Sequence, residues 1–231
     1  MENYTGHRAI AGVYHKIINE IPAFDSFHEL FAGSAAISSL LSVAAARLHV
    51  NEISPSVFLE LCSKFPESTV TNECAISLLK KWRPKKKQVI FLDPPYHHST
   101  RPKNTNLYEF EMPDDDHVKM LSAVVAMDKV KIMIIHPKCE LYDQMLADWR
   151  KVEIKIRYNR KTSFECLYMN FPATQDLHNY QYLGSDCWDR QRIKRKGDRL
   201  LAKLRKLPVL ERNYIINRIN EINQTQNEKT I

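Results

Sequence analysis

The sequence predicts an α/β fold, with a mostly parallel sheet, an antiparallel terminal hairpin and a basic helical C-terminal extension. Strand-like and helix-like segments alternate up to residue 171, which is typical of a parallel sheet covered by helices on both faces. Segment 88–92 is almost wholly apolar, and segment 131–136 contains four consecutive apolar residues, as strands buried on both faces do. We therefore expect one α/β domain over 1–188 and a basic helical extension over 189–231.

The first half of the chain is expected to consist of β–α units. Ser34 follows a strand-like run and could cap the alanine-rich helix after it. Ser54 and Pro55 are a typical helix start, with serine as the cap and proline in the first turn. The expected elements are a helix over 9–20, a strand over 27–31, a helix over 35–48, a strand over 49–53, a helix from 54 and helical sequence over 70–82.

The second half continues the same alternation around one long loop. Residues 97–113 are polar and too long for an ordinary connection, which favours a functional loop. Three consecutive aspartates, 114–116, fit the start of a helix because acids there favour the helix dipole. The expected elements are a strand over 88–92, a helix over 114–127, a strand over 131–136, a helix over 139–149 and a hairpin of strands over 152–158 and 164–171.

Composition narrows the class of protein. Hydrophobic residues make up 44% and charged residues 26% of the 231 residues, which are ordinary globular values that exclude wholesale disorder. No apolar run approaches the ~18 residues of a membrane span, and the first ten residues lack the apolar core of a signal peptide. The five cysteines have no zinc-site spacing, so we expect no metal. We expect a soluble cytoplasmic protein.

Positive charge is concentrated in two clusters. Residues 190–206 contain nine basic residues and one acid, so the net charge of this segment exceeds the formal net charge of +7 of the whole chain. Residues 80–87 contain six more basic residues. One such run alone is usually a solvated surface, but two in a small chain favour a nucleic acid as partner, because phosphate contacts release counterions. The candidate contacts in the extension are Arg192, Lys194, Arg195 and Lys196.

A small-residue turn follows the first expected strand. It consists of Phe31, Ala32, Gly33, Ser34 and Ala35. Small residues let the backbone approach a ligand, and the amino end of a helix offers free N–H groups. Glu52 ends the next strand, where a carboxylate can accept hydrogen bonds from both hydroxyls of a ribose. Taken alone, such a turn is more often ordinary helix–strand packing.

The most specific pattern is Asp93-Pro94-Pro95-Tyr96, directly after an apolar strand. Two prolines fix two φ angles and extend the residue before them, so Asp93 and the Pro94 carbonyl become rigid acceptors. Tyr96 adds an aromatic face beside them. This set suits a planar exocyclic amine, whose two N–H groups donate to the acceptors while its ring stacks on tyrosine.

In these motifs the sequence resembles the Dam-type (D12 class) DNA adenine-N6 methyltransferases. Residues 93–96 match the DPPY motif of that family, and 31–35 match its F-x-G-x-G turn. Asn51-Glu52-Ile53 matches its acidic strand end, and residues 4–8 match its cofactor-closing segment of an aromatic, a glycine and a lysine. Residues 165–171 are similar to its late E-x-L-W-x-N-Y strand.

The resemblance implies a Rossmann-like class I fold dependent on S-adenosylmethionine, which methylates the N6 of a flipped adenine, most readily in double-stranded DNA. By the family pattern Asp93, Pro94, Pro95 and Tyr96 form the catalytic motif. The residues bordering the cofactor would be Tyr4, Arg8, Phe31, Ala32, Gly33, Ser34, Ala35, Glu52, Ile53 and Asp93. In the loop after the motif, Arg101 and Lys103 are candidate phosphate contacts.

The chain departs from the family at three places. Arg8 replaces a lysine, Ala35 replaces the second glycine, and only 54–88 lies where the family usually carries a recognition domain. Two further functions stay open: an RNA methyltransferase acting on adenine N6 or guanine N2, and a nucleic-acid-binding protein without catalysis on the same fold. A Rossmann dehydrogenase is disfavoured because the chain has no G-x-G-x-x-G motif.

Overall fold

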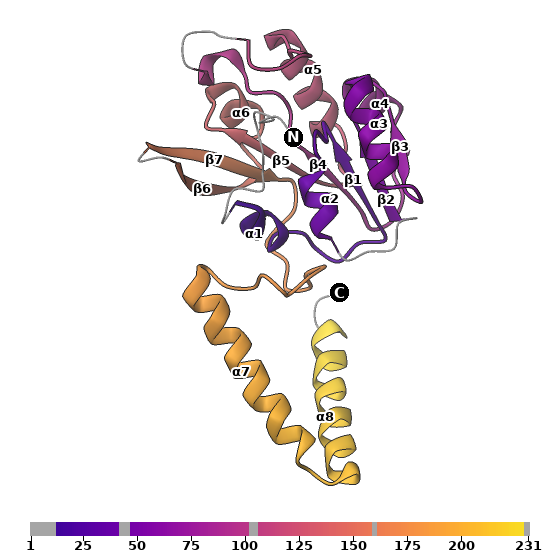
Figure 1. Cartoon of the computed structure of the whole chain (residues 1–231), viewed down its shortest axis with the longest axis vertical. Coiled ribbons are helices and arrows are strands. Elements are labelled where there is room, and N and C mark those ends of the chain that lie inside the picture. The colour runs from indigo at the N-terminus through magenta and orange to yellow at the C-terminus, as the bar shows by residue number, and fades with distance from the viewer. Residues whose placement is uncertain (1–12, 42–46, 102–105, 159–160, 229–231) are drawn as a thin grey trace. The chain divides into compact units, whose positions relative to one another are not determined.

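The computed structural model describes residues 13–41, 47–101, 106–158 and 161–228 (Figure 1). The chain divides into two compact units, Met1–Tyr182 and Leu183–Ile231. The domain boundary expected after residue 188 therefore falls inside the second unit, in the first turn of its first helix.

The first unit is built on a seven-stranded sheet with the strand order β3-β2-β1-β4-β5-β7-β6. The strands are β1 Ser26–Leu30, β2 Leu48–Asn51, β3 Thr69–Thr71, β4 Gln88–Leu92, β5 Lys131–Pro137, β6 Arg150–Tyr158 and β7 Lys161–Met169. All pairings among β1 to β5 are parallel, whereas β7 runs antiparallel to both β5 and β6. The predicted mostly parallel sheet with an antiparallel terminal hairpin is confirmed.

Helices cover both faces of this sheet (Figure 1). They are α1 Val13–Ile18, α2 Ala36–Leu40, α3 Pro55–Lys64, α4 Ala75–Lys81, the short 3₁₀ helix η2 His98–Thr100, α5 Asp114–Val125 and α6 Glu140–Met145. Helices α1 and α2 pack on one face, and α4, α5 and α6 on the other. This is the doubly wound arrangement that alternating strands and helices predict.

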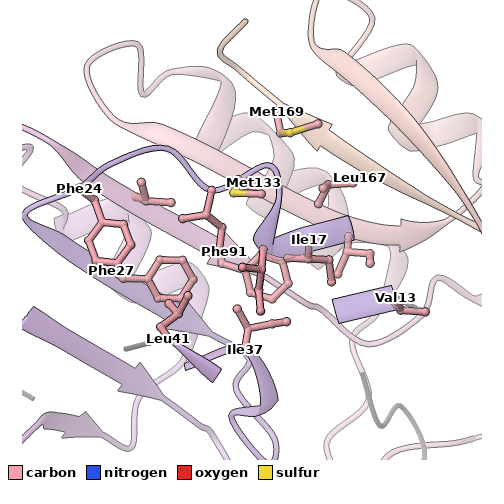
Figure 2. Close-up of a cluster of buried hydrophobic side chains, with 14 of the residues drawn as sticks. Val13, Ile17, Phe24, Phe27, Ile37, Leu41, Phe91, Met133, Leu167 and Met169 are labelled. Carbon is pink, nitrogen blue, oxygen red and sulfur yellow. The ribbon is translucent and has the colours of Figure 1, made fainter. Parts of the chain in front are cut away.

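The central strands alternate between the two cores because successive side chains of a strand point to opposite faces. In β4, Phe91 enters the α1–α2 core, whereas Leu92 enters the core under α4, α5 and α6. Figure 2 shows the first core, where Phe91 lies among Ile17 of α1, Ile37 of α2 and Met133 of β5. Strands buried in this way on both faces have nearly continuous runs of apolar residues in their sequences.

Some predicted elements have other bounds in the structure. The helix expected over 139–149 ends at Met145. Residues 70 and 71, expected to begin a helix, belong to the short strand β3 beside β2, and the helix starts only at Ala75. A three-residue strand is too short to show a period, so the helical pattern that follows it obscured it. The helix expected over 35–48 has Leu40 as its last helical residue, and Ser34 does not cap it: Ala35 occupies the N-cap position.

The second unit contains two long helices, α7 Cys187–Arg205 and α8 Val209–Glu228. Asp186 caps α7, its carboxylate accepting a 2.8 Å hydrogen bond from the Asp189 amide. Gly184 has a φ of 136°, and a Cβ there would lie 2.7 Å from the Arg190 backbone nitrogen, so only glycine fits this approach. Among the residues that the structure describes, no helix is long and apolar enough to cross a bilayer.

Candidate functional site

Two turns meet at the carboxyl edge of the sheet, one after β1 and one after β4. The two strands pair in parallel, with Leu30 opposite Leu92. From β1 the chain proceeds outward to β2 and β3, whereas β4 leads to β5 in the other direction, so this pair is the topological switch point. Ligands of open α/β sheets bind outside the strand ends at such a point. The Asp93 amide donates to the Leu30 carbonyl at 3.4 Å, so the two turns begin in contact.

The first turn is held in an unusual backbone conformation. Phe31, Gly33 and Ala35 have φ angles of 59°, 51° and 49°. This left-handed region costs a non-glycine residue roughly 1–2 kcal/mol. The Ala35 amide closes the turn by donating to the Ala32 carbonyl at 2.7 Å. A glycine at position 35 would adopt this φ without the steric cost that alanine has.

Glu52 binds this turn to the end of β2. Its Oε2 accepts a hydrogen bond from the Gly33 amide at 2.7 Å, and its Oε1 accepts from the amides of Ile53 and Ser54 at 2.8 and 3.0 Å. A carboxylate has about four acceptor positions, so Oε2 retains capacity for another donor. The buried carboxylate thus shapes the turn and can still take part in binding a ligand. Ile53 offers its backbone here, while its side chain is exposed.

A second carboxylate lies beneath the same edge, on β1, and our reading of the sequence did not single it out. Glu29 is buried, and its Oε2 accepts a 2.7 Å hydrogen bond from the Ser38 amide in α2. Burial raises the pKa of Glu29 to about 7, the nearby charge of Asp93 adds to the rise, and the hydrogen bonds from Ser38 oppose it. A charged residue in the middle of a strand expected to belong to a sheet covered on both faces was the signal that could have identified it.

The second turn, Asp93 to Tyr96, follows β4 directly. Pro94 is buried, and the other three residues are half-buried at the edge of the sheet. This is the placement that the sequence predicts for the motif, next to the turn at 31–35 and not remote from it.

Tyr96 is held at both ends. Its hydroxyl donates a 2.8 Å hydrogen bond to Oε1 of Glu165 on β7. Its carbonyl accepts hydrogen bonds from Arg101, through Nε at 2.7 Å and also through Nη2. The rings of Tyr108 and His136 stand nearly perpendicular to the Tyr96 ring, with centroids 6.1 and 6.0 Å away. The ring therefore has a fixed orientation relative to the turn.

Arg101 has a different environment from the one expected of a phosphate contact. Its side chain is wholly buried and forms an ion pair with Glu111 at 2.6 Å, besides its bonds to the Tyr96 carbonyl. Oε1 of Glu111 accepts hydrogen bonds from the amides of Leu107 and Tyr108. A buried, paired guanidinium has little to offer a phosphate, so we assign Arg101 to holding the loop against the second turn.

A buried histidine supports the residue after the motif. His136 accepts a 2.9 Å hydrogen bond from the His97 amide at Nε2, and its Nδ1 lies 2.8 Å from the Pro137 carbonyl oxygen. These partners require the neutral tautomer with its proton on Nδ1. The His136 ring stacks on Tyr142 at 4.0 Å, and the hydroxyl of Tyr142 lies 2.8 Å from Nδ1 of His117. Burial, together with the nearby His97, lowers the pKa of His117 to about 4.

The remaining predicted site residues belong to the second unit or lie outside the described ranges. Tyr4, Arg8 and Lys103 lie outside the residues that the structure describes. The four basic residues predicted in the extension are exposed on α7 of the second unit: Arg192, Lys194, Arg195 and Lys196. Of these, Arg192 pairs with Asp189 at 2.7 Å, one turn away on the same helix. Within the described ranges no group of three or more His, Cys, Asp or Glu could hold a metal ion.

Comparisons with known proteins add a distant likeness of fold. No family model matches the chain, and no curated protein matches it. Among solved structures, the chain is similar to a SAM-dependent methyltransferase from Agrobacterium tumefaciens, with 13% identity over 68% of this chain and 58% of that one, and a TM-score of 0.44.

Two further structures are similar at the same level. One is the N-methyltransferase NodS from Bradyrhizobium japonicum, with 13% identity over 68% of this chain and 93% of that one, and a TM-score of 0.45. The other is magnesium protoporphyrin IX methyltransferase from Synechocystis with bound SAM, with 11% identity over 68% of this chain and 74% of that one, and a TM-score of 0.43. Likenesses this distant carry no information on the substrate of this chain.

Proposed function

We propose that this protein is a DNA methyltransferase that moves a methyl group from S-adenosylmethionine to N6 of a flipped adenine. The observation that carries the proposal is the juxtaposition of the Gly33 turn and the Asp93–Tyr96 turn at the switch point of the sheet. A methyl donor and an amine acceptor have to lie side by side, and two ligand-binding turns on adjacent strands allow this.

The donor set at the first turn fits S-adenosylmethionine. Glu52 presents a carboxylate with spare acceptor capacity for a ribose hydroxyl, and the half-buried Gly33 and Ser34 next to it leave room for close approach. When bound, the cofactor supplies an electrophilic methyl group on a sulfonium. The family resemblance adds Tyr4 and Arg8 as further contacts, which stay predictions.

The second turn fits the acceptor. The lone pair of adenine N6 is delocalised into the purine ring, so it is a poor nucleophile until both N6 hydrogens are held out of the ring plane. Asp93 and the Pro94 carbonyl supply two acceptors for those hydrogens. Stacking of the base on Tyr96 contributes roughly 1–3 kcal/mol, comparable to the few kcal/mol that extruding a base from a duplex costs. In the proposed transfer N6 would gain the methyl group as the bond between the methyl carbon and sulfur breaks, which leaves the thioether S-adenosylhomocysteine, and N6 would release one hydrogen as a proton.

Nucleic acid as the partner is supported by the charge of the second unit. The basic residues of α7 are concentrated on one helix, where phosphates can replace their counterions. The cluster at 80–87 belongs to the first unit and directly precedes β4, at the strand end opposite to Asp93. The two clusters therefore offer separate contacts to a polyanion.

The test is transfer of a tritiated methyl group from S-adenosylmethionine to duplex DNA, followed by identification of the methylated nucleoside. We expect N6-methyladenine, and we expect Asp93→Ala to lower the rate at least about 100-fold because the acceptor amine is no longer positioned. Calorimetry should show that this variant still binds the cofactor. Asp148→Ala, which removes an exposed aspartate, is the matched control and should transfer at the wild-type rate.

The rival functions give different results in the same assay. Transfer to RNA in preference to DNA would identify an RNA methyltransferase acting on adenine N6 or guanine N2. Binding of nucleic acid without any binding of S-adenosylmethionine would identify a non-catalytic nucleic-acid-binding protein. Near-normal transfer by Asp93→Ala would refute the assignment of the second turn.

A further inference from the structure

Glu165 occupies a position whose contact the proposed mechanism does not use. It lies in the middle of β7, is 4% exposed, and pairs with Pro137 at the carboxyl end of β5. Its Oε1 accepts the hydrogen bond from the Tyr96 hydroxyl at 2.8 Å, across 69 residues of sequence. The strand β7, which is the last in chain order, thus contacts the tyrosine of the second turn.

Stability is a poor explanation for this contact. Burying a carboxylate is costly unless it is compensated, and an apolar residue of similar volume often serves the fold as well. A buried acid directed at this hydroxyl is better explained by the orientation it imposes on the ring.

The orientation is fixed by restraints at both ends of one residue. Arg101 holds the Tyr96 carbonyl, which fixes where the side chain starts, and Glu165 holds the hydroxyl, which fixes where the ring ends. The edge contacts of Tyr108 and His136 restrict rotation of the ring about its long axis. A planar acceptor that stacks on such a ring lies parallel to it, so the orientation of the ring also sets the direction in which the exocyclic nitrogen points.

We propose that Glu165 is a positioning residue for methyl transfer: through the Tyr96 hydroxyl it sets the plane of the ring on which the acceptor base stacks. This inference rests on the proposed function. Glu165 itself contacts neither the base nor the cofactor in this account, so its loss should affect the acceptor and leave the binding of S-adenosylmethionine unchanged.

Four variants test the inference by the kinetics of methyl transfer to DNA. Tyr96→Phe removes the hydroxyl and keeps the ring, and Glu165→Leu removes the acceptor. Each should lower kcat/KM for DNA about tenfold or more, the usual effect of a hydrogen bond to a charged group. Glu165→Gln retains a carbonyl oxygen for the hydroxyl and should lose less. Glu153→Leu changes an exposed residue of the neighbouring strand β6 and should match the wild type.

The double variant Tyr96→Phe with Glu165→Leu decides the mechanism. If Glu165 acts through the hydroxyl, the double variant is no worse than the poorer single one, and the dissociation constant of S-adenosylmethionine is the same in all variants. Additive losses, or weaker cofactor binding, would overturn the inference. If Glu165→Leu does not fold, the double variant Tyr96→Phe with Glu165→Gln takes its place. A rate of transfer below that of Tyr96→Phe alone would then overturn the inference.

Failure of the proposed function gives a distinct result. In that case the wild type itself transfers no methyl group to DNA, and the inference fails with it. Wild-type transfer with unaffected Tyr96→Phe and Glu165→Leu variants would instead overturn only the role of Glu165. A 2-aminopurine base in the DNA supplies a second readout, because stacking quenches its fluorescence. The quenching should weaken with Glu165→Leu and be partly restored with Glu165→Gln.

Discussion

The two turns at the edge of the sheet are held in different ways. The first turn, at 31–35, has positive φ angles and is closed by a hydrogen bond between two of its own residues. The Glu52 carboxylate, which follows the neighbouring strand β2, accepts a hydrogen bond from its Gly33 amide. The second, at 93–96, is held by side chains of Arg101, His136 and Glu165 from a loop and two other strands.

The conformation of the first turn thus depends mainly on local sequence, whereas that of the second depends on tertiary contacts. A turn that only needs small residues can be specified within five positions of sequence. A turn that has to present a carboxylate, a carbonyl and a ring in one geometry needs support from several directions, since loose support costs catalysis. We therefore expect the second turn to be the more sensitive of the two to distant substitutions.

The largest effect on stability is expected at Arg101. Arg101→Met leaves the Glu111 carboxylate without its ion pair and the Tyr96 carbonyl without two hydrogen bonds. Breaking a buried pair from one side is strongly destabilising, and we expect the free energy of unfolding to fall by about 3 kcal/mol. The midpoint of urea unfolding measures this change.

The matched control for Arg101→Met is an exposed ion pair. Lys119 and Asp116 approach to 2.7 Å on the surface of α5. Lys119→Met should leave the free energy of unfolding close to that of the wild type, because exposed pairs contribute little. If the two substitutions destabilised the protein equally, Arg101 would not be the support of the second turn.

An effect of similar size, but dependent on pH, is expected at Glu29 beneath the first turn. With a pKa near 7 in the folded state against 4.5 unfolded, the folded state holds a proton that the unfolded state loses between these values. The free energy of unfolding contributed by Glu29 therefore falls as pH rises from about 4.5 to about 7, by roughly 3 kcal/mol, and is constant above that.

Glu29→Gln isolates this contribution, because glutamine keeps an acceptor for the Ser38 amide and does not ionise. The difference in unfolding free energy between variant and wild type should grow in favour of the variant across that pH range. Denaturant titrations at pH 5, 6 and 7 measure it. A difference that does not change with pH would show that Glu29 is ionised in the folded protein.

The smallest effect is expected at Ala35 in the first turn. Ala35→Gly removes a buried methyl group worth about 0.8 kcal/mol but relieves the left-handed strain, so we expect a net change within about 1 kcal/mol. Ala32→Gly removes a buried methyl group without that relief. It should therefore be the more destabilising of the two by thermal unfolding, and the reverse order would show that the turn is not strained.

Much of the fold could be predicted because its signals are local and repeated. The run at 88–92 is apolar at four of five positions, and the structure has β4 at the same bounds. The acids at 114–116 mark the start of α5. The strand at 69–71 and the end of α2 were missed because three to five residues carry too little periodicity to compete with the helical patterns beside them.

Within the candidate site, the sequence predicted the two turns and Glu52, and it gave Arg101 as a candidate phosphate contact. From the sequence alone, an exposed arginine in a polar loop cannot be distinguished from a buried one. Only the position of Glu111, ten residues later, and of the Tyr96 carbonyl places its guanidinium in the interior. Similarly, His136 ends a buried strand, and nothing local shows that its ring accepts the His97 amide.

The sequence by itself determined most of the order of strands and helices, apart from β3, together with the small-residue turn and the Asp-Pro-Pro-Tyr motif, because each of these is a pattern of consecutive residues. Tertiary structure decided which segments meet at them: Glu165 with the Tyr96 hydroxyl, Arg101 with its carbonyl, and Glu52 with the Gly33 amide. The reason is that hydrogen bonds and ion pairs between distant segments depend on strand order and register, and these are set by packing of the whole sheet.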